Sequence, residues 1–234
     1  MRRLASLALA LALFALLAVP ILADSLFLPA VMWRYQAPVI NRVFVVGNSI
    51  SYHPVKPEIG WDNDWGMAAT SIDRDYVHRL AAMIGTRQSA PPTTRVFRST
   101  VASLTQRAPA IIGEIAAIQP DLIIVQVSDN MPESDATQDS FYTPYASLLE
   151  SIRGVSGAQI ICVGSWSSVA PVRDGFILEA ATINGAAFVP ITDLSLQYEN
   201  RAESQMACLG TGICWHPSDA GMERIAERIM QALG

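Results

Sequence analysis

Short β-branched segments alternate with longer amphipathic segments along most of the chain, and this alternation constrains the fold most strongly. Parallel strands need long crossover connections, and they become nearly continuous apolar runs when helices cover both faces of their sheet. The pattern therefore predicts an α/β fold, a three-layer α/β/α sandwich around a parallel sheet of about five strands. The predicted strands are RVFVVG (42–47), TTRVFRS (93–99), DLIIVQVS (121–128), AQIICVGS (158–165) and AAFVPI (186–191), and the predicted helices lie near 73–84, 101–118, 140–153, 174–184 and 218–233.

The beginning of the chain has the pattern of an export signal. Two arginines precede a long apolar run that extends from Leu4 to Ala23. The run is longer than the roughly 7 to 15 apolar residues of a signal peptide, and it reaches the roughly 20 that span a bilayer. We interpret residues 1–23 as a signal peptide or an N-terminal membrane anchor, residues 24–41 as a linker, and residues 42–234 as the folded domain.

The charges around the apolar run predict where the folded domain lies. Basic residues precede the run and few follow it, which favours a non-cytoplasmic position for the rest of the chain. We expect an exported protein, periplasmic or secreted, which is anchored to the inner membrane by residues 4–23 if the segment is not cleaved. Contact with a membrane is expected only through that segment.

The overall charge argues against a nucleic acid as partner. The formal net charge is -5, from 16 basic and 21 acidic residues. Apart from Arg2 and Arg3 there is no dense basic run that could neutralise phosphates, so we predict no binding to nucleic acid.

The chain has three cysteines, and the redox environment of the protein decides whether they form a disulfide. In an oxidising compartment Cys208 and Cys214 are close enough in sequence to bridge a small loop, with Cys162 free and buried. Alternatively, all three are small core residues. No cysteine pairs with a histidine at metal-ligand spacing, and the aspartates of residues 62–75 lack the glycine and final glutamate of an EF-hand loop. We predict no metal site.

A serine and a histidine stand where a parallel sheet exposes its ligand site. Ser49 follows the first predicted strand and His216 precedes the last predicted helix. In open α/β sheets ligands bind beyond the carboxyl ends of the strands. A serine hydroxyl needs a base to become a nucleophile, and His216 is the best-placed histidine. In the alternative interpretation Ser49 only closes a turn, and His216 belongs to a helix cap made by Ser218 or Asp219.

The other two histidines are assigned structural roles. His53 lies in the loop just after Ser49 and is expected to shape that loop. His78 lies four residues after Arg74 on a predicted helix, and we expect it to be partly exposed or hydrogen-bonded.

Three segments resemble motif blocks of the SGNH, or GDSL-like, hydrolases. VFVVGNSIS (43–51) is similar to the first block in its Gly-Asn-Ser variant, VQVSDN (125–130) to the third, and HPSDAGMERIA (216–226) to the last. IGWDNDWGMAATSIDRDYVH (59–78) resembles a segment of a bacterial, exported subgroup. The resemblance spans essentially the whole predicted domain. It implies a flavodoxin-like SGNH-hydrolase fold and a serine esterase that needs no metal or organic cofactor.

The same resemblance implies roles for individual residues. Ser49 would attack an acyl carbonyl, with His216 as general base and then general acid. The oxyanion would be bound by the backbone amide of Ser49 and the side-chain amide of Asn130. The family's oxyanion glycine is missing from FRSTVAS (97–103), and Gly66 is a weaker candidate to supply that amide.

A further departure from the family pattern concerns the acid that orients the histidine. The acid usually stands three residues before the histidine, where this chain has Ile213. An acid orients the imidazole and stabilises its charged form. We expect a Ser-His dyad, with the imidazole held by a backbone carbonyl or by a distant carboxylate such as Asp193 or Asp219.

The expected reaction is cleavage of a short acyl ester, in particular an acetyl ester on a carbohydrate. The substrate would be a small molecule or a polysaccharide. Trp61, Trp65 and Trp166 are expected to line a sugar-binding rim together with Trp215, unless they pack in the core or in a lid.

Two alternative functions keep the same fold. The first is an acyltransferase accessory to exopolysaccharide synthesis, for example of a cellulose-type polymer, with polysaccharide-synthesis proteins as partners. The second is a non-catalytic module for binding or assembly, which the absence of the acid at Ile213 would favour. Such a module would not need Ser49, Asn130 and His216 together.

Overall fold

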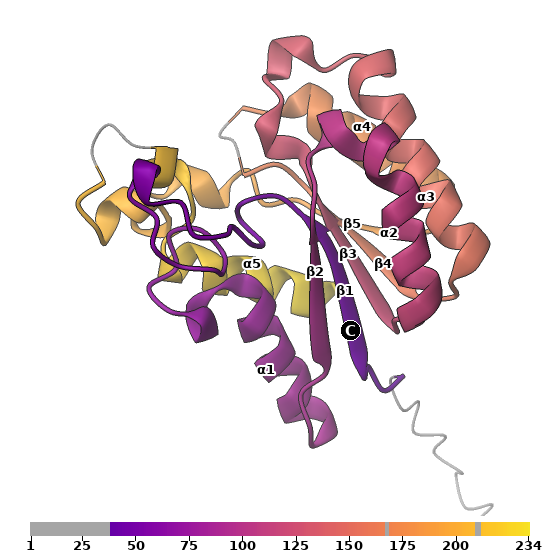
Figure 1. The fold of residues 1–234 in the computed structure, drawn as a ribbon, viewed down its shortest axis with the longest axis horizontal. Helices are drawn as coiled ribbons and strands as arrows, with labels where there is room; N and C mark the ends of the chain where they lie inside the picture. Colours follow the sequence, from indigo (N-terminus) through magenta and orange to yellow (C-terminus); the bar gives the residue numbers. More distant parts are fainter. Residues whose placement is uncertain (1–37, 167–168, 209–211) are drawn as a thin grey trace, which may run out of the picture. The chain divides into compact units, whose positions relative to one another are not determined.

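Five parallel strands form one sheet in the computed structural model, which describes residues 38–166, 169–208 and 212–234 (Figure 1). The spatial order is β2-β1-β3-β4-β5, and each pair of neighbours is parallel. Each strand lies within one of the five segments predicted from the alternation. The strands are β1 (Arg42–Gly47), β2 (Thr93–Arg98), β3 (Leu122–Gln126), β4 (Gln159–Val163) and β5 (Ala187–Val189).

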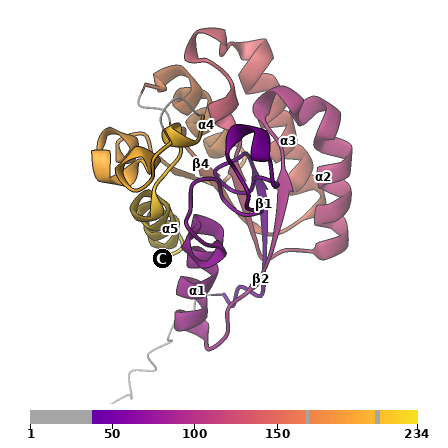
Figure 2. The same ribbon diagram turned by 60° about the vertical axis from the view of Figure 1, so that its left-hand side comes forward.

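Helices cover both faces of the sheet (Figures 1 and 2). On one face lie α1 (Tyr76–Gln88) and α5 (Asp219–Ala232). On the other lie α2 (Leu104–Ile118), α3 (Thr143–Val155) and α4 (Pro171–Ile183). The predicted three-layer α/β/α sandwich with a parallel, five-stranded sheet is confirmed.

The two cores explain why the strands are continuous apolar runs. Val43 and Val45 of β1 pack with residues of α1 and α5, whereas Phe44 and Val46 pack with α2, α3 and α4. All four side chains are buried. Successive side chains of a strand point to opposite faces, so a strand covered on both faces needs apolar residues at every position.

The first helix begins later than the sequence pattern predicts. α1 begins at Tyr76 rather than near Asp73, because Ile72–Arg74 form a separate 3-10 turn. The buried side chain of Asp75 caps the helix by accepting a hydrogen bond from the amide of His78 at 2.8 Å. Such a cap satisfies an amide that the start of a helix leaves unpaired. The other predicted helices agree with the structure to within a few residues.

The predicted export segment, residues 1–23, lies outside the described residues, as do residues 24–37 of the predicted linker. None of the helices in the part of the chain that the structure describes is long and apolar enough to span a membrane.

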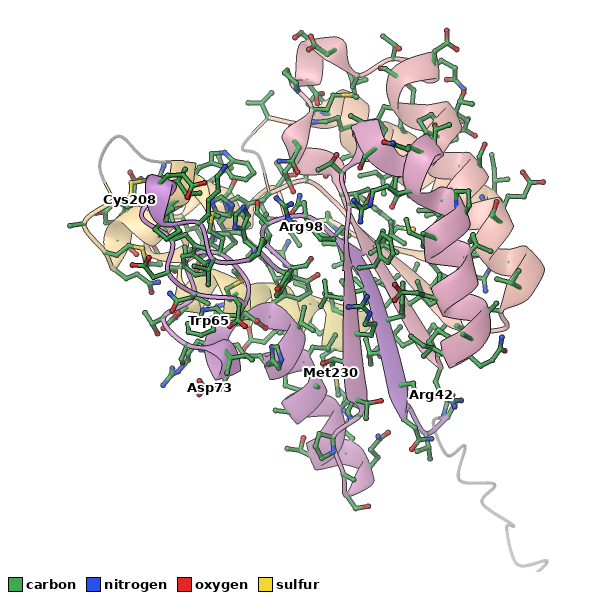
Figure 3. The ribbon with its side chains drawn as sticks, in the orientation of Figure 1. Arg42, Trp65, Asp73, Arg98, Cys208 and Met230 are labelled. Carbon is green, nitrogen blue, oxygen red and sulfur yellow. A yellow bond between two sulfur atoms is a disulfide. The ribbon has the colours of Figure 1, made fainter. Side chains whose placement is uncertain are left out.

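The loops at the carboxyl end of the sheet carry Ser49, which follows β1, and Asn130, which follows β3. Arg42 at the start of β1 and Arg98 at the end of β2 mark the two opposite ends of the sheet, and Cys208 lies toward the end marked by Arg98 (Figure 3). Short 3-10 turns at residues 128–130 and 212–215 belong to these loops.

Candidate active site

Ser49 lies in a tight turn directly after β1. The carbonyl of Asn48 accepts a hydrogen bond from the amide of Ser51 at 3.1 Å, and Asn48 Oδ1 accepts one from the amide of Ile50 at 2.9 Å. Gly47 permits this turn, because a Cβ at that position would collide with the side chain of Ser51. The turn leaves the Ser49 side chain half-buried, within reach of a ligand at the end of the sheet.

His216 meets Ser49 from a distant part of the chain. Its Nε2 atom lies 2.7 Å from Ser49 Oγ, and its Nδ1 atom lies 2.9 Å from the carbonyl oxygen of Gly212. A carbonyl can only accept, so Nδ1 carries the ring proton and Nε2 accepts a hydrogen bond from the serine hydroxyl. This is the tautomer that a general base for Ser49 needs.

A backbone carbonyl holds the imidazole, which is one of the arrangements expected for a chain without the family's acid. Ile213 is buried in an apolar cluster. Asp193 pairs instead with Arg228, and Asp219 accepts hydrogen bonds from a threonine of the loop before α1. The two aspartates considered from the sequence are therefore engaged elsewhere, and the carbonyl of Gly212 takes their place.

Burial changes the basicity of His216. The residue is only 6% exposed, and desolvation lowers its pKa to about 4, although hydrogen bonds with the carbonyls of Gly212 and Ile213 act in the opposite direction. The imidazole is therefore neutral at pH 7 and can accept a proton.

The acid limb of the pH profile should reflect this low pKa. We expect kcat/KM for p-nitrophenyl acetate to stay constant down to about pH 5 and to fall tenfold per pH unit below about pH 4, because only the neutral imidazole accepts the serine proton. The measurement is the initial rate as a function of pH, read at the wavelength at which nitrophenol and nitrophenolate absorb equally. A half-maximal rate near the ordinary histidine value of 6.5 would contradict the prediction.

Acid unfolding needs its own control in that experiment. The lowered pKa means that the unfolded chain binds a proton at His216 that the folded chain does not, so stability falls as the pH drops from 6.5 towards 4. Circular dichroism at each pH separates a loss of fold from protonation of the folded protein.

Two of the three predicted oxyanion donors, the amide of Ser49 and the side chain of Asn130, form no hydrogen bond to a protein acceptor within the described residues. Asn130 ends the 3-10 turn Ser128–Asn130 after β3, and its side chain is exposed. The amide of Ser49 takes no part in the turn's hydrogen bonds. Both groups are thus available to bind an oxygen that gains charge.

Asp129 connects the turn that contains Ser49 with the turn that carries Asn130. Its Oδ2 atom accepts hydrogen bonds from Asn48 Nδ2 at 3.2 Å and Gln126 Nε2 at 2.5 Å. Its Oδ1 atom accepts a hydrogen bond from the amide of Trp166 at 2.7 Å. Sequence reasoning missed this residue, although an acid beside the motif asparagine was a signal. We infer that Asp129 is a positioning residue.

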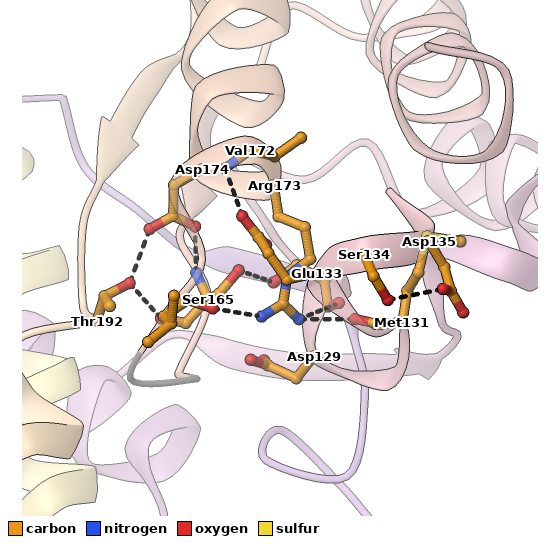
Figure 4. A network of polar contacts seen from close by, with 12 residues as sticks. Asp129, Met131, Glu133, Ser134, Asp135, Ser165, Val172, Arg173, Asp174 and Thr192 are labelled. Carbon is orange, nitrogen blue, oxygen red and sulfur yellow. Dashed lines mark hydrogen bonds and ion pairs between the residues drawn. The ribbon is translucent and has the colours of Figure 1, made fainter. Parts of the chain in front are cut away.

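The side chain of Arg173, from α4, contacts the turn after β3 (Figure 4). Its guanidinium donates to the carbonyls of Ser128 at 3.2 Å and Met131 at 2.9 Å, and it pairs with Glu133 at 2.9 Å. The arginine is buried, so its five donors need such acceptors. The network holds the backbone on both sides of Asn130.

Gly66 does not face the ligand site. Its amide donates to Asp75 Oδ2 at 3.2 Å, and Gly66 is buried against the carbonyl of Ile50. The next amide, of Met67, donates to the carbonyl of Ser49 at 2.9 Å. The prediction that Gly66 binds the oxyanion is therefore wrong. This segment supports the turn of Ser49 instead.

Two of the four tryptophans predicted to form a rim lie in the core. Trp61 is 3% exposed and Trp166 is 1% exposed. The indole of Trp61 donates to the carbonyl of His53, and that of Trp166 donates to the carbonyl of Trp215. Trp65 is partly buried and packs edge-on against Trp61. The rim prediction is wrong for Trp61 and Trp166, because indoles satisfied by backbone carbonyls can be buried completely.

Trp215 is the exposed tryptophan of the site. It is 40% exposed, and its ring meets the ring of His216 edge-on with centroids 5.5 Å apart. Beside it lies a hollow of about 290 Å³. The hollow is lined by Asp129, Asn130, Met131, Pro132, Glu133, Val169, Arg173 and Trp215.

The remaining histidines have the structural roles expected for them. The amide of His53 donates to the carbonyl of Trp65 at 2.9 Å, which ties the loop after Ser49 to residues 59–74. His78 Nδ1 lies 2.8 Å from the buried Asp75. This hydrogen bond raises the pKa of His78 above 6.5, although partial burial of the imidazole acts to lower it.

Replacing His78 by glutamine should destabilise the protein most below pH 6.5. Protonated His78 pairs with Asp75 only in the folded state, so the contribution is complete below the unfolded pKa of 6.5 and is lost as the pH rises through the higher folded pKa. Urea unfolding from about pH 5 to about pH 9 measures the difference between the two proteins. Arg87→Gln on the same helix is the control, with a difference that stays constant. A pH-independent effect of His78→Gln would refute the assignment.

The cysteines adopt one of the two states left open by the sequence. Cys208 and Cys214 form a disulfide with Cα atoms 5.3 Å apart. Cys162 is free and buried, and burial raises its pKa to about 12.

Comparisons with known proteins identify the fold. No protein-family model matches the sequence, and no curated protein matches it. Solved structures do match, among them an acetyl xylan esterase from Geobacillus stearothermophilus, with a TM-score of 0.56, 16% identity, and coverage of 83% of this chain and 94% of that chain. A family 3 carbohydrate esterase from Clostridium thermocellum matches with a TM-score of 0.57, 14% identity, and coverage of 83% and 96%. A structure described as that of a GDSL-like lipase from Parabacteroides merdae has a TM-score of 0.55, 15% identity, and coverage of 85% and 98%.

Proposed function

We propose that this chain is an SGNH, or GDSL-like, serine esterase with Ser49 as nucleophile and His216 as general base. The observation that carries the proposal is the 2.7 Å contact between Ser49 Oγ and His216 Nε2, in the tautomer that the Gly212 carbonyl fixes. The fold shared with esterases of this kind supports it. A module used only for binding would gain nothing from a buried, neutral imidazole held against a serine hydroxyl.

The reaction follows from the proton positions. Ser49 Oγ bonds to the acyl carbon while its proton moves to His216 Nε2, and the carbonyl oxygen becomes an oxyanion that the Ser49 amide and Asn130 bind. Collapse of this intermediate breaks the bond to the alcohol oxygen, which takes the proton from Nε2. Water then repeats the sequence on the acyl-enzyme, releases the acid and restores the hydroxyl of Ser49.

The proposed substrate is a short acyl ester, in particular an acetyl ester on a carbohydrate. Trp215 supports this choice, because an exposed indole beside a hollow is suited to stack on the apolar face of a sugar ring. Asn130 lines the same hollow, so a sugar bound there would hold its ester close to the proposed oxyanion donor. The solved structures similar to this chain include esterases described as acting on acetylated xylan and on acetylated mannans.

Replacing Trp215 by alanine should raise KM for an acetylated xylo-oligosaccharide about tenfold, because the sugar ring would lose an apolar surface, and apolar burial contributes about 25 cal/mol per Å². The KM for p-nitrophenyl acetate should change less, because that ester has no sugar to stack. Tyr198→Ala is the matched control, since Tyr198 is an exposed aromatic residue that does not line the hollow. Equal effects of Trp215→Ala on both substrates would refute a sugar platform.

Export of the chain is also part of the proposal. The apolar segment of residues 4–23 would direct the domain to the periplasm or the cell exterior, as a cleaved signal or as an anchor. The disulfide between Cys208 and Cys214 supports an oxidising compartment.

Turnover and active-site labelling together test the proposal. The purified protein should hydrolyse p-nitrophenyl acetate, and a fluorophosphonate probe should add to Ser49 as read by mass spectrometry. Ser134→Ala, which removes an exposed serine outside the site, should label like the unchanged protein. A folded protein without turnover or labelling would exclude a serine esterase and favour a binding module.

A further inference from the structure

The loop that orients the proposed general base is closed by a disulfide. Cys208 and Cys214 are bridged, and Gly212 lies between them in the sequence. Gly212 begins the 3-10 turn Gly212–Trp215, which contains Cys214 and leads directly into His216. The carbonyl oxygen that accepts from His216 Nδ1 therefore stands two residues from a bridged cysteine.

Packing at Gly212 itself does not hold this carbonyl. Gly212 is exposed, and a Cβ added to it would meet no atom within 4 Å among the described residues. Glycine also has the widest choice of backbone conformations. A neutral carbonyl at such a position orients an imidazole only if neighbouring residues fix the peptide.

The neighbouring residues are anchored in a small apolar cluster. Cys208 and Ile213 are 6% and 4% exposed, and they pack with buried residues of the loop beside Ser49, including Met67. Cys214, which is partly buried, packs against the same cluster, and the disulfide fixes it there through Cys208. The bridge thereby restricts the backbone on the carboxyl side of Gly212.

We propose that the Cys208–Cys214 disulfide is a positioning element for the catalytic base, because it holds in place the carbonyl that orients His216. The bridge holds the Gly212 carbonyl against His216 Nδ1, and so keeps Nε2 aimed at Ser49. The inference rests on the proposed esterase function. Its consequence is that the enzyme works at full rate only when the bridge is oxidised.

Reduction by dithiothreitol provides the direct test. The dithiol supplies two electrons and two protons, the disulfide becomes two thiols, and the reagent closes to its cyclic disulfide. The full-length protein, purified in detergent, is assayed with p-nitrophenyl acetate before reduction, after reduction and after reoxidation. Thiol alkylation and mass spectrometry establish the state of each cysteine.

We expect reduction to lower kcat about tenfold or more with KM changed less than about twofold, because a misoriented imidazole impairs proton transfer rather than binding. Reoxidation should restore kcat. The variant Cys208→Ser/Cys214→Ser should already have the low kcat and should not respond to the reductant. Cys162→Ala, which removes the free cysteine, should respond like the unchanged protein.

Two results would overturn the inference. The first is a fully reduced, folded protein whose kcat is unchanged. The second is a loss of kcat that only follows a loss of fold, as read by circular dichroism on the same samples.

A spectroscopic measurement keeps this inference separate from the esterase proposal. In the oxidised protein the Nδ1 proton of His216, hydrogen-bonded to Gly212, should give a slowly exchanging, downfield proton resonance that disappears on reduction or in the double serine variant. If no ester is turned over in either state, the proposed function fails, while the resonance still tests the role of the bridge. A resonance that persists unchanged after reduction would refute that role.

Discussion

Replacing Ser49 by alanine is expected to lower kcat/KM for p-nitrophenyl acetate by about 10⁴-fold or more, as loss of the nucleophilic serine does in a serine protease. The methyl group cannot form an acyl-enzyme, so only the oxyanion donors and substrate binding remain. Fluorophosphonate labelling should disappear together with turnover. The measurement is the initial rate of both proteins at equal, titrated concentration.

The fold should survive this substitution. The side chain of Ser49 is half-buried, and its hydroxyl contacts His216 rather than the turn, which Asn48 and Gly47 maintain. We expect the free energy of unfolding to change by about 1 kcal/mol or less. Ser134→Ala should retain full activity. An active Ser49→Ala protein would show that another group is the nucleophile.

Replacing His216 by asparagine is expected to lower kcat by about 10³-fold or more, because the amide cannot accept the serine proton. The residue is buried, so the variant should also lose about 1–3 kcal/mol of stability from an imperfectly paired polar group. Activity is measured at a temperature where circular dichroism shows the variant to be folded.

The double variant Ser49→Ala/His216→Asn separates a catalytic pair from two independent residues. Residues that act as a unit show strongly non-additive effects, so the double variant should be no slower than Ser49→Ala alone. Losses that multiplied would mean that His216 contributes to the rate by a route other than through Ser49.

The sequence predicts the layered fold well because the relevant signal is local. In β1, the run from Val43 to Val46 has an apolar side chain at every position, which is what a strand buried on both faces requires. The late start of α1 was missed because it depends on a single cap at Asp75. The apolar pattern continues across residues 72–74, so it does not show that the helix begins only after the cap at Asp75.

The site could be predicted only in part. Ser49 and His216 stand at strand and helix ends, where topology alone brings them to one edge of the sheet. The carbonyl of Gly212 leaves no mark in the sequence, because every residue has a carbonyl. The exposure of tryptophans is likewise set by tertiary packing, and so Trp166 is buried while Trp215 is exposed.

The strand order gives the site a property that does not depend on its side chains. The connection that leaves β1 runs through α1 on one face to β2, whereas the connection that leaves β3 runs through α3 on the opposite face to β4. Connections that leave in opposite directions open a crevice at a topological switch point, and in this strand order that point lies between β1 and β3. The turns with Ser49 and Asn130 follow these two strands. The place of the proposed site is therefore set by the strand order, whereas loop residues such as Trp215 can be exchanged without changing it.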